Sequence, residues 1–119
     1  MIQERELEQY CLAKKGTEKT YPFGPDTIVI KVLGKMFALW GEGDKPLRVN
    51  LKCDPDWSLF LREHYAAISA GYHMSKKHWN TVEFDGSIPP EEIWEMVDHS
   101  YNLVVKKLRK VDKERLAAL

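Results

Sequence analysis

Cysteine is scarce in this sequence, and neither sign of charge is in excess. The chain has only two cysteines: Cys11 lies between Tyr10 and Leu12, and Cys53 continues the apolar face of Leu47, Val49 and Leu51. Two are too few for the disulfide framework of a small secreted domain, so we expect both to be buried, reduced thiols. Basic and acidic residues number 18 each, which gives a formal net charge of zero. Because nucleic-acid-binding domains usually carry a basic excess, any such site here would have to be a local patch.

Long hydrophobic runs are also missing. No apolar stretch approaches the roughly 20 residues of a membrane-spanning helix. The first six residues, MIQERE, carry charges where a signal peptide would have an apolar run. We therefore expect a cytoplasmic protein with no membrane contact. The length suits one domain over residues 1–119, and a hydrophobic content of 44% is sufficient for a core without disulfides or metals.

Motifs for metal binding and catalysis are absent as well. The sequence has no CxxC or HExxH, and His73 and His78 are five positions apart, which does not suit one face of a helix or a strand. Cys53 or Ser75 beside either histidine, oriented by Asp85, would give the residue types of a nucleophilic site, but nothing in the sequence fixes that geometry. The sequence therefore predicts no metal, no cofactor and no enzyme.

Apolar periodicity predicts three main helices and four strands. The expected helices span residues 2–14, 55–68 and 90–109, and the expected strands span 27–33, 36–40, 47–53 and 78–85. Residues 17–26 are expected to form a loop, while a short strand at 72–75 and a last helical piece at 112–119 are left open. Short connections between the first three strands indicate an antiparallel meander. The prediction is a two-layer α+β fold, an antiparallel sheet with helices on one face, in the order α-βββ-α-β(β)-α.

The strand at 47–53 alternates strictly between apolar and polar residues. One face should pack against helices, and the other, which carries Arg48, Asn50 and Lys52, should be solvated. The two strands before it are apolar on both faces, so some of their side chains must point away from the helices. These are Val29 and Leu33, with either Phe37 and Leu39 or Met36, Ala38 and Trp40. Such a patch marks a partner surface, unless the 17–26 loop covers it, and both outcomes stay open.

Three ring side chains have a structural interpretation. His64 falls on the apolar face of the second expected helix, so it should be a core histidine. His99 lies off the apolar stripe of the long third helix and should be exposed. Trp79 begins a strand, and a tryptophan there belongs to the core more often than to a base-stacking site.

The most distinctive stretch is residues 71–86, GYHMSKKHWNTVEFDG. It contains the adjacent lysines Lys76 and Lys77, with no acidic residue before position 83, and a histidine on either side, His73 and His78. Lysines of this kind neutralise phosphates and release counterions. A solvated basic loop accounts for the same residues, so the stretch alone does not establish nucleic-acid binding.

Several segments of the chain resemble the MmcQ/YjbR family of small bacterial proteins. They are GYHMSKKHWNTV at 71–82, DGS at 85–87, the acidic pair at 91–92, DHSYNLV at 98–104, and, upstream, YPFG at 21–24, GKMFA at 34–38 and DW at 56–57. Ala70 and Ser75 stand where that family commonly has proline and asparagine. The resemblance implies a two-layer α+β fold likened to type III secretion chaperones and to a double-wing DNA-binding domain of a phage transcription factor. It supplies no catalytic residues.

The resemblance and the basic loop together predict a non-enzymatic DNA-binding domain. The expected contacts are Lys76 and Lys77 to phosphate, His73, His78 and Asn80 to sugar or base edges, and Arg48 and Lys52 in support. One alternative is a protein-interaction or chaperone-like module, for example a homodimer, that uses the open face of the sheet. Another is an enzyme or small-ligand binder around His73, His78 and Asp85, which a deep pocket joining them would favour.

Overall fold

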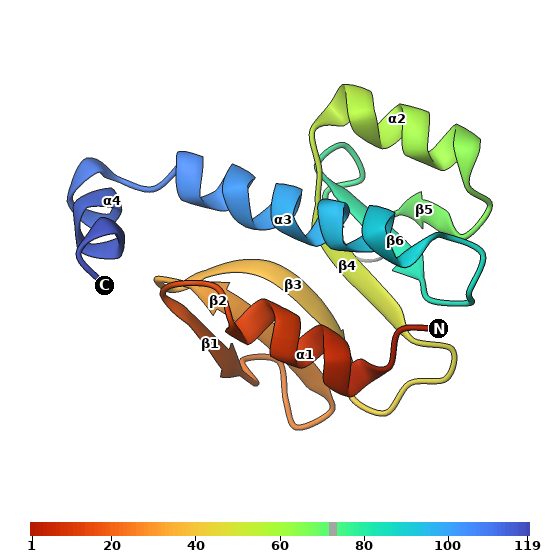
Figure 1. Ribbon diagram of the computed structural model, residues 1–119, viewed down its shortest axis with the longest axis horizontal. Coiled ribbons are helices and arrows are strands. Elements are labelled where there is room, and N and C mark those ends of the chain that lie inside the picture. The colour runs from red at the N-terminus through yellow and green to blue at the C-terminus, as the bar shows by residue number, and fades with distance from the viewer. Residues whose placement is uncertain (72–73) are drawn as a thin grey trace.

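An antiparallel sheet with helices on one side forms the centre of the protein (Figure 1). The computed structural model describes residues 1–71 and 74–119, and in these ranges the sheet has six strands in the order β1-β2-β3-β4-β6-β5. The elements are α1 (Glu4–Leu12), β1 (Thr17–Thr20), β2 (Thr27–Val32), β3 (Lys35–Gly41), β4 (Arg48–Lys52), α2 (Pro55–His64), β5 (Ile68–Ala70), β6 (Trp79–Glu83), α3 (Pro90–Lys106) and α4 (Lys110–Ala117). The predicted two-layer α+β architecture is confirmed. No helix within these two ranges is both long and apolar enough to cross a membrane.

The two edge strands differ from the prediction. Residues Thr17–Thr20, expected to be part of a loop, form β1 and pair with β2. The second helix, expected to reach residue 68, ends at His64, and β5 then pairs with β6. Tyr65 already has extended backbone angles, so the chain turns toward the open edge of the sheet. As a result His64 is exposed, and its prediction as a core histidine is wrong.

A β-bulge decides which side chains of β3 face the helices. The register between β2 and β3 shifts by one residue between Ile30 and Lys31, because Phe37 is an extra residue in β3. Neither predicted alternative for the facing of this strand therefore holds. Phe37, Ala38 and Trp40 lie in the core under the helices, and Met36 and Leu39 lie on the opposite face.

Ser100, buried on α3, connects β3 and β4 near the bulge. Its hydroxyl donates to the carbonyl of Phe37, at 2.5 Å, and accepts the N–H of Lys52, at 2.9 Å. Buried backbone groups are costly to leave unpaired, so this one side chain serves two groups of the sheet.

The neighbours of Ser100 tie α3 to α1. Asp98 accepts hydrogen bonds from the hydroxyl of Tyr10, at 2.7 Å, and from the ammonium group of Lys14. The hydroxyl of Tyr101 donates to the carbonyl of Lys15, at 2.7 Å. The segment DHSYNLV, which carries part of the family resemblance, therefore has a structural role. It joins α3 to α1 and the residues after it, and it joins α3 to the sheet.

A second, smaller apolar cluster lies on the sheet face opposite the helices. Val29, Leu39 and Trp79 are buried there, and Met36 and Met74 pack against them. The apolar surface predicted on this face is thus covered mainly by the protein itself, with Met74 coming from the segment between β5 and β6. The prediction that Trp79 belongs to the core is confirmed.

Candidate nucleic-acid interface

The segment that leads into β6 forms a tight turn with a fixed backbone. The carbonyl of Ser75 accepts the N–H of His78, at 3.2 Å, and that of Trp79, at 3.0 Å. The guanidinium group of Arg62, on α2, donates to the carbonyls of Lys76 and Trp79. The turn is therefore held by its own backbone and by α2, and its geometry does not depend on the lysine side chains. We call residues 75–78 the lysine turn.

Lys76 and Lys77 both project from the lysine turn into solvent. Neither takes part in any of the ion pairs found among the described residues. Two adjacent ammonium groups without carboxylate partners are the arrangement that phosphate binding uses. His78, at the end of the turn, is half-buried, and His73 lies outside the described residues.

Lys52 adds positive charge beside the lysine turn. It is half-buried at the end of β4, opposite Trp79 on β6. Burial, and next the nearby charge of Lys107, lower the pKa of its ammonium group. Arg48 differs, because its guanidinium group lies 3.5 Å from the carboxylate of Glu83 and is partly neutralised by it. Of the two supporting residues predicted, Lys52 thus remains the stronger candidate.

Asn80 does not lie on this surface. Its side chain is only 2% exposed, and its amide oxygen accepts hydrogen bonds from the hydroxyl of Ser58 and from Nε of Arg62, both at 2.7 Å. The alternation of β6 turns Asn80 toward the helices and Trp79 and Thr81 toward the opposite face. The prediction that Asn80 contacts a base edge is therefore wrong, because its amide is enclosed between the sheet and α2.

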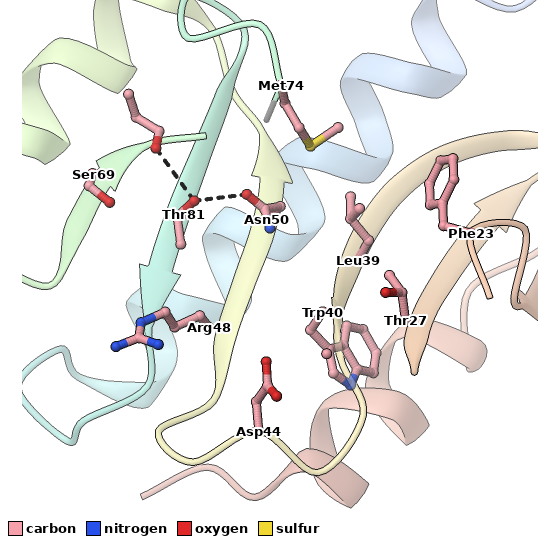
Figure 2. A pocket seen from close by; sticks show the side chains of 12 residues that line it. Phe23, Thr27, Leu39, Trp40, Asp44, Arg48, Asn50, Ser69, Met74 and Thr81 are labelled. Carbon is pink, nitrogen blue, oxygen red and sulfur yellow. Dashed lines mark hydrogen bonds between the residues drawn. The ribbon is translucent and has the colours of Figure 1, made fainter. Parts of the chain in front are cut away.

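A groove of about 840 Å³ opens on the sheet face opposite the helices (Figure 2). Arg48, Asn50, Ser69 and Thr81 give it a polar side over β4, β5 and β6, while Phe23, Leu39 and Met74 give it an apolar side. Asp44, from the β3–β4 connection, lies at one end. The amide oxygen of Asn50 accepts a hydrogen bond from the hydroxyl of Thr81, at 2.8 Å. This pairing orients the amide nitrogen of Asn50 as a donor.

Sequence reasoning found only part of this groove. The alternation of β4 correctly placed Arg48 and Asn50 on the polar face. The sequence did not predict that Phe23 and Met74 line the groove, because each comes from a loop whose path over the sheet has no local sequence pattern. The YPFG segment at 21–24 is the one signal that pointed to Phe23, as part of the family resemblance.

The YjbR family model matches residues 12–103 of the chain. The protein belongs to the YjbR family. It is 35% identical over 114 residues to the uncharacterized protein YjbR of Escherichia coli K12, covering 96% of this chain and 97% of that one. It is 40% identical over 99 residues to the uncharacterized protein YbdF of Escherichia coli O157:H7, with 83% and 81% covered.

A solved structure of a YjbR relative supports the same assignment. The crystal structure of Deinococcus radiodurans protein DR2400, described by the domain name DUF419, superposes with a TM-score of 0.88 at 39% identity. The match covers 95% of this chain and 86% of that one. The predicted resemblance is thus confirmed. Since the names of these relatives give no activity, membership in the YjbR family establishes the fold and leaves the function to be argued from the site.

Nothing in the described part of this YjbR protein points to catalysis. Burial raises the pKa of both Cys11 and Cys53 to about 12, so neither forms a thiolate readily. The carboxylate of Asp85 accepts hydrogen bonds from the N–H and the hydroxyl of Ser87, which lower its pKa and occupy it within its own turn. Residues 1–71 and 74–119 contain no cluster of three side chains suited to a metal ion.

His99 is half-buried, not exposed as the sequence predicts. Its Nε2 accepts the backbone N–H of Asp54, at 3.0 Å, and its ring meets that of Trp57 edge-on. Burial lowers the pKa of the imidazole below its ordinary value of 6.5, although the charges of Asp54 and Glu95 act in the opposite direction. Only the neutral ring has a free lone pair for the N–H of Asp54, so protonation removes this support for the start of α2.

We expect the protein to lose stability as the pH falls below about 6.5, because of His99. The unfolded chain then takes up the proton more readily than the folded one, so the free energy of unfolding decreases with decreasing pH. His99→Gln supplies an acceptor that does not titrate and should flatten this decrease. Urea unfolding at several pH values between about 7 and 5 measures it. His64→Gln, at an exposed histidine of α2, is the matched control and should leave the decrease as in wild type. An equal decrease in the His99→Gln variant would contradict this role.

Proposed function

We propose that this YjbR protein is a non-enzymatic DNA-binding protein and that the lysine turn is its phosphate contact. The observation that carries the proposal is the fixed turn that presents Lys76 and Lys77 without an acidic partner among the described residues. Lys52, opposite Trp79 at the end of the lysine turn, adds positive charge, and Lys107 lies near Lys52. Because the chain has no net charge, attraction for DNA would come from this local patch.

The histidines have secondary roles in this proposal. His78 ends the lysine turn and would contact sugar or base edges. His73, which precedes the lysines in the sequence, is proposed for the same role from the sequence alone. Arg48 contributes less than predicted, since Glu83 already pairs with it. Asn80 has no direct role.

A salt titration of DNA binding tests the proposal. Fluorescence anisotropy with a labelled mixed-sequence duplex should give an association constant that falls with salt, with a log–log slope of about −2 to −4 for two to four phosphate contacts. A protein that does not bind at low salt, or binds with a slope near zero, would refute it.

The second candidate is a protein-interaction module that pairs with a second copy of the chain. The specific observation is the apolar outer surface of α2, where Leu59 and Phe60 are 58% and 57% exposed. The sheet face that the sequence suggested for this purpose is less suitable, because its apolar residues are largely buried. Sedimentation velocity at micromolar concentration distinguishes the two candidates: a dimer that Phe60→Ser dissociates supports the module, and a monomer at all concentrations excludes the homodimer.

A further inference from the structure

The groove and the lysine turn are linked through Met74, which immediately precedes the turn. Met74 lines the groove, packs in the apolar cluster that contains Trp79, and precedes Lys76 by only two positions. Figure 2 shows Met74 extending over the groove from the segment that leads to β6. A molecule held by the lysines through a phosphate would therefore be close to the Met74 side of the groove.

The groove itself is unsuited to phosphate. Its charged side chains are Arg48, already paired with Glu83, and Asp44, whose carboxylate repels an anion. On its apolar side Leu39 is buried and Met74 is half-buried, but Phe23 is 64% exposed beside the groove. The lining thus combines an apolar wall with hydrogen-bonding groups of both kinds: donors on Arg48 and Asn50, and an acceptor on Asp44.

We infer that the groove holds an unpaired nucleobase of a single-stranded nucleic acid whose phosphates lie on the lysine turn. A base has apolar faces that stack on aromatic and thioether side chains, here Phe23 and Met74. Its edge carries donors and acceptors that match Asn50 and Asp44. The inference rests on the proposed function and makes single strands the preferred ligand of the same surface.

Duplex DNA does not supply such a base readily. Each base of a duplex is stacked on both faces and paired at its edge, so its stacking and pairing must be broken before it can enter the groove. A single strand avoids this cost. The lysine turn contacts both forms through phosphate, but only the single strand gains from the groove.

Four ligands separate these contributions in one anisotropy assay: a short mixed-sequence single strand, an abasic strand of the same length, the duplex, and free mononucleotides. We expect the single strand to bind about tenfold or more tightly than the abasic strand. Phe23→Ala should lower the affinity for the single strand by about 5- to 100-fold. It should leave the salt slope of that binding and the affinity for the duplex unchanged. Val111→Ala is the matched control, since Val111 is an apolar residue that is 51% exposed on α4, and it should leave the affinities of all four ligands unchanged.

The outcomes distinguish the inference from the proposed function. Equal binding of the abasic and normal strands, with no effect of Phe23→Ala but a normal salt slope, would overturn the base site and leave DNA binding intact. An affinity that does not change with salt for any of the strands would overturn both the base site and the proposed DNA binding. Mononucleotides that bind as tightly as the strand would assign the groove to free nucleotides and overturn the strand as its ligand.

Discussion

Replacement of both lysines of the turn, Lys76→Ala with Lys77→Ala, should weaken duplex binding by about 10- to 100-fold at low salt. Each lysine that contacts a phosphate releases about one counterion, so the log–log salt slope should become less negative by about 2. Both side chains are exposed and make no ion pair within the described residues, so the variant should fold like wild type. The same anisotropy titration measures the slope, and thermal unfolding checks the fold.

Two control variants make this result specific. Lys110→Ala with Lys113→Ala removes the same charge from exposed positions on α4 and should leave the slope unchanged. Lys76→Arg with Lys77→Arg keeps the charge and should keep the slope. If the α4 variant lost as much slope as the variant of the lysine turn, binding would depend on overall charge and not on this site.

The architecture was predictable because its main signals are local. Strict alternation along β4 identified its two faces, and the apolar stripe of α3, with acidic residues at its start and basic residues at its end, identified that helix. The edge strands lacked such signals. β1 reads TEKT, with no apolar residue to mark a buried face, and β5 has three residues. Each is a strand because a neighbouring strand offers unpaired backbone groups.

The positive charge of the candidate site was predictable from the sequence, but the contacts that hold the lysine turn in place were not. The lysine pair stands out in the sequence, while Arg62, which anchors the turn, is 14 positions away on another element. The orientation of β6 was not readable either. Its two faces carry Trp79 with Thr81 and Asn80 with Val82, one apolar and one polar residue on each side, so the pattern does not show which face meets the helices.

The buried network around Asn80 gives the largest expected effect on stability. Asn80→Ala should lower the free energy of unfolding by about 2–4 kcal/mol, because it removes the acceptor for two donors at once. Ser58 is 1% exposed and Asn80 is 2% exposed, so water cannot replace the lost hydrogen bonds without opening the contact between α2 and the sheet. Arg62 keeps its bonds to the turn carbonyls, which limits the loss.

Urea unfolding compares this variant with two others. Asn102→Ala removes an exposed amide from α3 and should change the free energy of unfolding by less than about 0.5 kcal/mol. Asn80→Asp keeps an oxygen acceptor facing Ser58 and Arg62, so it should lose less than Asn80→Ala. Wild-type stability of Asn80→Ala would show that α2 does not depend on this network.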